Sequence, residues 1–409
     1  MRPFIYGREI IMVAWHSGEH PERLAYAMWS AIAESTLPVA HTLIATYGPI
    51  GALDRVASWV DRGAPGPYRD ALDRLAPRLA TTSIERLVDR HLAYGGFVLT
   101  PEDDAWPEGL NDLGPAAPLA LWGRGGAALG PVPERGAPNV GPGSVESPTA
   151  GGSGTGMIAM VGARAATGYG LDFATTASGQ LATMGYTVVS GGAYGIDAAA
   201  HRGALAAAGR TVAVLAGGPD RLYPAGNTEL LHAIEAEGMI LSEHPPGRQP
   251  ARFRFLQRNR LIAALGAATV VVQAALRSGA LHTARRAAEL GRGVGAVPGP
   301  VTEQMSAGCH EAVRSGFATL VTDAAEIAEL ASAIGQVDAS KHSHRRGVLD
   351  GLDPLQARVY DALPASGSAE LVTLADVSGL SVGEVRSALG YLQLAGRVEV
   401  RGERYRRSR

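Results

Sequence analysis

Two glycine-rich turns carry residue types that could bind phosphate. The first turn reads GARAATGYG at 162–170 and contains Arg164, and the second reads SGGAYGID at 190–197. Glycine lets the backbone approach an anion closely, and the first N–H groups of a following helix have no intrahelical partner. A guanidinium can donate two parallel hydrogen bonds to one phosphate. A single turn of this kind often does no more than reverse the chain, but several on one edge predict an anion-binding rim.

An arginine-rich segment adds a second chemical feature, since it reads RFRFLQRNRLI at 252–262 and contains Phe253 and Phe255. Guanidinium groups hold backbone phosphates, while aromatic rings offer faces on which unpaired bases stack. The pattern favours single-stranded nucleic acid as the ligand. In the structural alternative the phenylalanines are core residues, and the arginines are solvated or paired with Glu243.

These segments lie in a repeating pattern of apolar strand, turn and helix from Met157 to Thr322. Runs rich in Val, Ile and Ala are typical of parallel strands covered on both faces, and about seven are present. They occupy 157–162, 186–190, 210–218, 238–247, 268–279, 293–299 and 318–322. The predicted fold class is α/β, with a Rossmann-like doubly wound, mostly parallel sheet. Ligands bind outside the carboxyl ends of such strands. The rim is therefore predicted at VGAR, SGGAYGID, AGGPDRLYP, SEHPPG, AALRSG and VPGPV.

Taken in order, these motifs resemble the DNA-processing protein A family (DprA, also called Smf). The first turn of that family commonly reads GSR-x-AT-x-YG, and the second reads SG-x-A-x-GIDAAAH-x-GAL. The corresponding segments here are GARAATGYG at 162–170 and SGGAYGIDAAAHRGAL at 190–205. The resemblance continues through FLQRNRLIAAL at 255–265 and ALRSGALHTARRAAELGR at 275–292, and extends to SAGCHEAVRSG at 306–316.

The resemblance implies a cytoplasmic, dimeric protein that binds single-stranded DNA and loads the RecA recombinase during natural transformation. It implies no catalysis, cofactor, metal ion or membrane contact. Two departures from the family are Ala163, which lacks the usual serine hydroxyl, and Tyr194, where many relatives carry Arg. The pattern and the resemblance together place the DNA and phosphate contacts on Gly162, Arg164, Thr167, Gly191, Gly192, Tyr194, Gly195, Arg252, Arg254, Phe255, Arg258, Asn259, Arg260, Ser278 and Gly279.

An enzymatic alternative comes from the wider fold group, which includes nucleoside-monophosphate phosphoribohydrolases. Those enzymes carry a PGG-x-GT-x-x-E turn whose glutamate helps to cleave a glycosidic bond. The matching region here is LRSGALHTARRAAELG, and Arg286 stands three residues after Thr283. Without a positioned carboxylate the general acid–base step has no agent. Asp197 and Glu243 are instead expected to cap and to form ion pairs, so a non-enzymatic binding protein is predicted.

Composition narrows these alternatives. The chain has 409 residues and a net charge of −2, so nucleic-acid binding would depend on a local basic patch. The single cysteine, Cys309, excludes intramolecular disulfides and cysteine-rich metal sites and is expected to be a small packed residue at a turn. His201, His244 and His282 match no metal-binding spacing and are expected at turns or on helix surfaces. No uncharged apolar run reaches about 18 residues, and the N-terminus lacks a cleavable hydrophobic segment, so neither membrane insertion nor secretion is expected.

The N-terminal third predicts three further parts. Residues 20–92 read as helices and resemble a sterile-alpha-motif or helix-hairpin-helix domain, with a helix, a Gly turn and a second helix at 41–60. A packing or oligomerisation role is favoured there over DNA contact. Residues 93–124 form a lead-in to the core at 157–332. Between them, residues 125–156 are rich in Gly, Pro and Ser and predict a disordered insertion.

A second linker is predicted at 333–351, followed by a separate domain at 352–409. The domain reads as helix, helix, helix and two short strands, and it resembles a winged helix-turn-helix. Its third helix, at 381–395, exposes only Arg386 and Gln393 as readers of DNA. The wing could hold a DNA backbone through Arg397, Arg401, Arg404, Arg406, Arg407 and Arg409. DNA contact and a protein-interaction or structural role both stay open for this domain.

Overall fold

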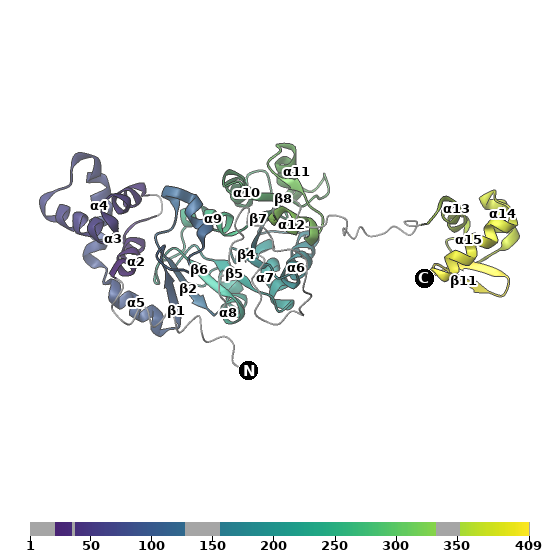
Figure 1. The fold of residues 1–409 in the computed structure, drawn as a ribbon, viewed down its shortest axis with the longest axis horizontal. Coiled ribbons are helices and arrows are strands. Elements are labelled where there is room, and N and C mark those ends of the chain that lie inside the picture. The colour runs from purple at the N-terminus through teal and green to yellow at the C-terminus, as the bar shows by residue number, and fades with distance from the viewer. Residues whose placement is uncertain (1–20, 35–36, 127–155, 333–351, 409) are drawn as a thin grey trace, which may run out of the picture. The chain divides into compact units, whose positions relative to one another are not determined.

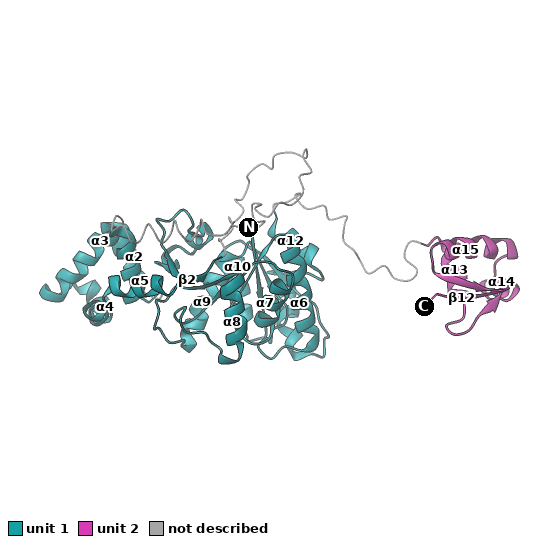
Figure 2. Ribbon diagram, turned by 90° about the horizontal axis from the view of Figure 1, so that it is seen from below, with its two compact units in different colours: residues 1–339 teal, residues 340–409 magenta. Residues whose placement is uncertain are grey.

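The computed structural model of the chain describes residues 21–34, 37–126, 156–332 and 352–408 (Figure 1). By internal contacts the chain divides into two compact units, residues 1–339 and 340–409 (Figure 2). Most of the predicted insertion at 125–156, the whole predicted linker at 333–351 and Arg409 lie outside the described residues.

A nine-stranded sheet forms the centre of the first unit, in the order β1-β2-β6-β5-β4-β3-β7-β8-β9. Strands β3 to β9 are parallel to their neighbours among themselves, while β2 pairs antiparallel with both β1 and β6. The strands are β1 Gly96–Leu99, β2 Leu121–Gly125, β3 Met157–Val161, β4 Thr187–Ser190, β5 Thr211–Val214, β6 Met239–Ser242, β7 Ala268–Val271, β8 Gly293–Ala296 and β9 Thr319–Leu320. The prediction of a mostly parallel α/β sheet is confirmed, and each predicted apolar run contains one of the strands β3 to β9.

The estimate of about seven strands for residues 157–322 is confirmed, but the sheet also includes β1 and β2 from the predicted lead-in. Both are short and contain glycine, reading GFVL and LWGRG. Neither has the long run of branched apolar residues that identifies a buried parallel strand. They extend the sheet as an antiparallel edge.

Helices cover both faces of the sheet, and β3 shows how the sequence encodes this arrangement. Met157, Ala159 and Val161 pack in a cluster with residues of α9 and α10, whereas Ile158 and Met160 pack with α6 and α7. Side chains alternate between the two faces of a strand, so a strand covered on both faces is apolar throughout. The helices are α6 Gly168–Thr183, α7 Ile196–Ala206, α8 Thr228–Glu237, α9 Arg252–Leu265, α10 Gly279–Glu289, α11 Ala307–Arg314 and α12 Ala324–Ala331. Short 3₁₀ helices lie at Gly66–Tyr68, Glu108–Ala116, Ala225–Asn227 and Gln304–Ser306.

The N-terminal helices pack on the antiparallel edge of the sheet. Trp29 belongs to the same buried cluster as Val98 of β1 and Trp122 of β2, and the indole N–H of Trp122 donates to the Ser30 hydroxyl at 3.0 Å. These helices therefore belong to the same compact unit as the sheet. They are α2 Pro21–Ile32, α3 Pro38–Arg62, α4 Arg69–Thr81 and α5 Ile84–Ala93. Helix α3 kinks at Gly48, where φ is 69°, which is the position of the predicted Gly turn.

The second unit has a core of its own, built around Val359, Leu374 and Leu389. Capping boxes begin two of its helices, with Asp353 before α13 and Ser381 before α15. Its three-stranded antiparallel sheet has the order β10-β12-β11. The elements are α13 Pro354–Ala362, β10 Ala369–Glu370, α14 Leu371–Ser378, α15 Val382–Leu394, β11 Val398–Arg401 and β12 Arg404–Arg407. The sequence did not predict the short strand β10.

The prediction for His201 was wrong, because this residue is buried on α7. His244 lies in the bend after β6, as expected, but is also buried. Burial lowers the pKa of His201 to about 3, and its Nδ1 lies 2.7 Å from the Thr211 hydroxyl. His282 is exposed on α10, as expected. Cys309 is buried, as predicted, but it lies on α11 and not at a turn. Burial raises the pKa of its thiol to about 11. Within the described residues, every helix falls short of the length and apolar character needed to cross a bilayer.

Candidate functional site

A cleft lies where the strand order reverses. The chain passes from β3 through α6 to β4 on one side, whereas β7 lies on the other side of β3 and leads away to β8. In open α/β sheets ligands bind at such a switch point, outside the carboxyl ends of the strands. A cleft of about 690 Å³ is present there, a volume in the range of small-ligand sites. Its lining comes from the turns after β3 and β4, from the loops around Tyr223 and Pro250, from α9 and from the start of α10.

The first glycine-rich turn contributes Gly162, Ala163 and Arg164 to the cleft. A Cβ on Gly162 would lie 2.5 Å from the Ile196 side chain, so only glycine fits between the turn and α7. Arg164 is exposed, and its guanidinium carbon lies 5.3 Å from the centre of the Phe255 ring. The structure thus presents a solvated cation at the mouth of the cleft.

Thr167 does not line the cleft, and its amide and hydroxyl groups are hydrogen-bonded within the protein. Its hydroxyl caps α6 by accepting the N–H of Gly170, and it also accepts from the Gln273 side chain at 2.8 Å. The Thr167 N–H donates to Gln273 Oε1 at 2.9 Å. The sequence placed Thr167 among the phosphate contacts, but in the structure it fastens the first turn to the strand end at β7.

The second turn folds around Asp197 and offers fewer free amides than the sequence suggested. The Asp197 carboxylate accepts the N–H groups of Gly191 at 3.1 Å and Ala193 at 3.4 Å. Gly192 and Gly195 have φ values of 67° and 76°, which favour glycine. Of this turn, only Ala193 and Asp197 line the cleft. Two amides of the predicted anion-binding turn, those of Gly191 and Ala193, are therefore hydrogen-bonded within it.

Tyr194 stands beside the cleft without lining it. Its ring is 47% exposed, and its hydroxyl accepts the N–H of Gly226 at 3.2 Å. The side chain that replaces the common family arginine thus fastens the turn after β4 to the loop after β5.

Helix α9 separates the predicted arginines into different environments. Arg252, Phe255, Arg258 and Asn259 line the cleft. Arg252 is exposed, and within the described part of the chain its side chain has no hydrogen bond or ion pair. Asn259 donates to the carbonyl oxygen of Gly279 at 3.3 Å and so links α9 to the start of α10.

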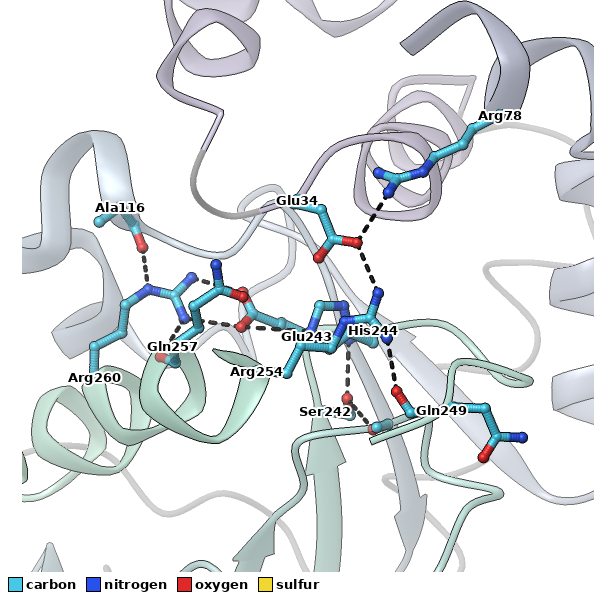
Figure 3. A network of polar contacts seen from close by, with 11 residues as sticks. Glu34, Arg78, Ala116, Ser242, Glu243, His244, Gln249, Arg254, Gln257 and Arg260 are labelled. Carbon is cyan, nitrogen blue, oxygen red and sulfur yellow. Dashed lines mark hydrogen bonds and ion pairs between the residues drawn. The ribbon is translucent and has the colours of Figure 1, made fainter. Parts of the chain in front are cut away.

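Two of the predicted contacts, Arg254 and Arg260, lie outside the cleft in a network of polar side chains (Figure 3). Arg260 forms a buried ion pair with Glu243, with N–O distances of 2.9 and 2.6 Å, and its Nε donates to the carbonyl oxygen of Ala116. Arg254 pairs with Glu34 at 2.8 Å, and Arg78 pairs with the same carboxylate. The structural alternative, an ion pair with Glu243, therefore holds for Arg260.

Arg258 forms the floor of the cleft. Its side chain is buried, and Nη1 donates to the carbonyl oxygen of Val214 at 2.5 Å. A Cβ on Gly191 would lie 1.9 Å from Nη1, so the guanidinium fills space that only a glycine leaves. Burial lowers the pKa of Arg258 to about 10, although Asp197 raises it. Burial likewise raises the pKa of Asp197 against the attraction of Arg258. Arg258 remains charged at neutral pH and supports the second turn from below.

The start of α10 closes the far side of the cleft with Ser278 and Gly279. The Ser278 hydroxyl accepts the N–H of Leu281 and caps the helix. The first amides of a helix carry partial positive charge. The cleft therefore combines the exposed cations Arg164 and Arg252 with a helix N-terminus, and Asp197 at its floor faces Arg258.

Some lining residues were not predicted as contacts. Tyr223, Pro250 and Leu256 line the cleft, and of these three the sequence placed only Tyr223 on the rim, within the segment AGGPDRLYP. Strand ends marked that segment, but nothing in the sequence showed which of its side chains faces inward. Within the described ranges, no group of His, Cys, Asp and Glu is arranged to hold a metal ion.

Comparisons with known proteins match the region that contains the cleft. The family model described as DNA recombination-mediator protein A matches residues 152–332. A Mycobacterium tuberculosis protein that carries the DprA name is 42% identical over 403 residues, which span 94% of each chain. The chain belongs to the DprA/Smf family. Protein Smf of Synechocystis sp. is 31% identical over 354 residues, covering 79% of this chain and 83% of the relative.

A solved DprA/Smf structure supports the fold. The X-ray structure of DNA processing protein A from Streptococcus pneumoniae has a TM-score of 0.58 and 27% sequence identity, and the match covers 76% of this chain and 98% of that one. DNA processing and recombination mediation are thus the roles by which the DprA/Smf family is described. The predicted resemblance to this family is confirmed.

Proposed function

We propose that this DprA/Smf protein binds single-stranded DNA in the switch-point cleft and passes it to a RecA-type recombinase, without catalysing a reaction. The observation that carries the proposal is the lining of the cleft. Exposed cations at Arg164 and Arg252 stand beside the rings of Phe255 and Tyr223. Cations that follow a backbone, together with rings that accept bases, favour a single strand over a duplex.

Each part of the cleft has a proposed task. Arg164 and Arg252 contact phosphates through charge-assisted hydrogen bonds. Asn259 and the capped start of α10 at Ser278 and Gly279 extend this track. Arg258 mainly holds the floor of the cleft in place and does not contact phosphate, because its Nη1 already donates to the carbonyl oxygen of Val214.

The test is a salt titration of binding to labelled oligothymidylate, beside a duplex of equal length. We expect a preference for the single strand, with log affinity falling against log salt by about 0.7 for each phosphate contacted. Absence of binding at low salt, or a preference for the duplex, would contradict the proposal.

A homodimer is part of the proposal, and the free edge of the sheet supports it. Within the described residues β9 is the last strand of the sheet, and Leu320 on it is 47% exposed. Large apolar side chains at an open edge favour association. The molar mass by light scattering should be that of two chains, and Leu320→Arg should reduce it to that of one. A cytoplasmic location follows if the partner is a recombinase acting on DNA inside the cell.

We also propose that the second unit is a winged helix, with α15 as its third helix and β11 and β12 as its wing. Most of the wing arginines are engaged within the unit. Arg404 pairs with Glu370 at 3.0 Å, Arg406 pairs with Glu399, and Arg407 donates to the carbonyl oxygen of Tyr360. DNA contact by the wing would have to break these bonds, so a protein-interaction or structural role is favoured over backbone binding.

No observation favours the hydrolase alternative. Arg286, which stands where that enzyme class has glutamate, lies outside the cleft and pairs with Glu289 at 2.9 Å. The cleft carboxylate Asp197 accepts two backbone N–H groups and is influenced by Arg258. We therefore expect no free base when the protein is incubated with nucleoside monophosphates and the mixture is separated by chromatography.

A further inference from the structure

Tyr223 lines the cleft with an exposed ring, although the sequence did not predict it as a DNA contact. It lies in the loop after β5, and its ring lines the cleft. We propose that an unpaired base stacks on Tyr223, and not on Phe255 as the arginine-rich segment suggested. This inference rests on the proposed binding of single-stranded DNA in the cleft.

Phe255 is already occupied by other side chains. The Arg164 guanidinium carbon lies 5.3 Å from the centre of its ring, and the Arg258 guanidinium carbon lies 6.0 Å from it. The Tyr223 ring also contacts Phe255, with 5.7 Å between centroids and 57° between planes. A cation over an aromatic face is attracted to it. A base on this face of Phe255 would have to displace Arg164, the residue best placed to bind phosphate.

Tyr223, by contrast, presents an open ring. Its side chain is 48% exposed, and its ring contact in the described part of the chain is with Phe255 alone. The hydroxyl has no hydrogen-bond partner among those residues. An amphipathic ring with a solvated tip can stack on a base and also donate to a phosphate or a base edge.

The loop that carries Tyr223 is fastened on both sides of the ring. On one side, the Asn227 amide donates to the carbonyl oxygens of Gly192 at 2.9 Å and Ala193 at 3.1 Å. On the other side, the Asp220 carboxylate accepts the N–H of Gly247 at 2.8 Å. Binding therefore orders little of this loop, which preserves the free energy gained from stacking.

Tyr223, Phe255 and Arg164 are successive members of one wall of the cleft. Phe255 supports the tyrosine at its edge and Arg164 at its face, so a base site and a phosphate site are held by the same ring. Bases inside a duplex already stack on their neighbours, and a lone base has a free face for Tyr223. The stacking ring thus favours single strands and tolerates any base.

The test compares oligothymidylate with an abasic deoxyribose-phosphate chain of equal length, each bound to the full-length protein. Tyr223→Leu keeps an apolar side chain but removes the ring. We expect it to weaken oligothymidylate binding by about five- to a hundred-fold and to leave the abasic chain unaffected. Tyr223→Phe keeps the ring, so it should retain the stacking and lose at most the contribution of one hydroxyl hydrogen bond. The salt slope should not change in either variant, because stacking releases no counterions.

Tyr94→Leu is the matched control, because it removes a 76% exposed tyrosine from the same compact unit at a site outside the cleft. It should alter neither ligand. Unchanged oligothymidylate binding in Tyr223→Leu, or an equal loss on both ligands, would overturn the stacking role. A wild-type protein that does not bind oligothymidylate would instead contradict the proposed function itself.

Discussion

Helix α9 presents two faces whose arginines look alike in sequence and differ in the structure. On the cleft face, Arg252 is exposed and has no partner within the described ranges. On the opposite side, Arg254 and Arg260 are held by Glu34 and Glu243 (Figure 3). Only a cation without a carboxylate partner is available to phosphate. Which arginines of α9 can bind a ligand therefore depends on the residues that surround each side chain, and not on the number of arginines in the helix.

The two faces also differ in what they contribute to the protein. A buried ion pair makes the fold sensitive to loss of either partner, since the remaining charge is left without compensation. An exposed cation contributes little to stability. The network face should therefore govern the free energy of unfolding, and the cleft face should govern affinity for DNA.

The largest effect is expected at Arg260. Arg260→Ala leaves the Glu243 carboxylate buried without its partner and should lower the free energy of unfolding by about 3–5 kcal/mol. Denaturant titration followed by circular dichroism measures this loss. Arg286→Ala is the control, because it breaks the more exposed Arg286–Glu289 pair and should cost no more than about 0.5 kcal/mol. A similar small loss in both variants would remove the distinction between the faces.

Arg258 is buried like the network arginines and lines the cleft like Arg252, so its loss should affect both protein stability and DNA binding. Arg258→Ala removes a hydrogen bond from a charged donor to Val214 and empties the space beneath Gly191. We expect a loss of about 2–3 kcal/mol in stability, together with weaker DNA binding. Unfolding and oligothymidylate binding should be measured on the same preparation. Normal stability with weakened binding would instead make Arg258 a direct phosphate contact.

On the cleft face, Arg164→Ala and Arg252→Ala should each weaken oligothymidylate binding by about 1–3 kcal/mol. Each should also reduce the salt slope by about 0.7, because one phosphate contact is lost. Stability should change by no more than about 0.5 kcal/mol. Arg254→Ala is the matched control from the other face of the same helix, and it should lower stability while leaving the salt slope unchanged. Equal slopes in all of these variants would refute the assignment of the faces.

The strands and turns of the core could be predicted because their signals are local. A strand that is covered on both faces must be largely apolar, and β3 to β8 follow this rule, whereas the two residues of β9 are exposed. The first turn was also predictable, because Gly162 stands where a side chain would collide with α7 and Arg164 lines the cleft as a cation. The hydrogen bonding of the second turn was not predictable. Asp197 accepts two N–H groups of this turn, but in the sequence it was expected only to cap a helix or to form an ion pair.

The pairing of arginines could not be predicted, because the deciding partners are distant in the chain. Glu34 is contributed by the segment after α2, more than two hundred positions before Arg254. Glu243 was a candidate partner, but its neighbour His244 gave no sign that the site is buried. The open ring of Tyr223 likewise depends on Arg164 covering Phe255, a contact between separate turns. Such facts appear only when the elements are assembled.

The smallest predicted effect concerns pH and again separates the two faces. His244 lies in the network, and its Nε2 is 3.9 Å from Glu243. Burial lowers the pKa of His244, as do Arg254 and Arg248, whereas Glu243 and Glu34 raise it. In the unfolded chain a histidine takes up a proton near pH 6.5, while the folded protein resists this. Above pH 6.5 the imidazole is neutral in both the folded and the unfolded state, so His244 makes the free energy of unfolding independent of pH there. This free energy falls as the pH drops from 6.5 towards the lowered pKa of His244.

One histidine of this kind can contribute at most about 1.4 kcal/mol for each pH unit. His244→Gln should therefore flatten the dependence of unfolding free energy on pH between about 6.5 and 5. His201 and His91 are also buried but are present in both proteins, so the difference isolates His244. His282→Gln is the control, because it removes an exposed imidazole and should leave the pH dependence of the unfolding free energy unchanged. Parallel curves for wild type and His244→Gln would show that the network does not hold this histidine neutral. DNA affinity of the folded protein should not follow the difference, because His244 lies outside the cleft.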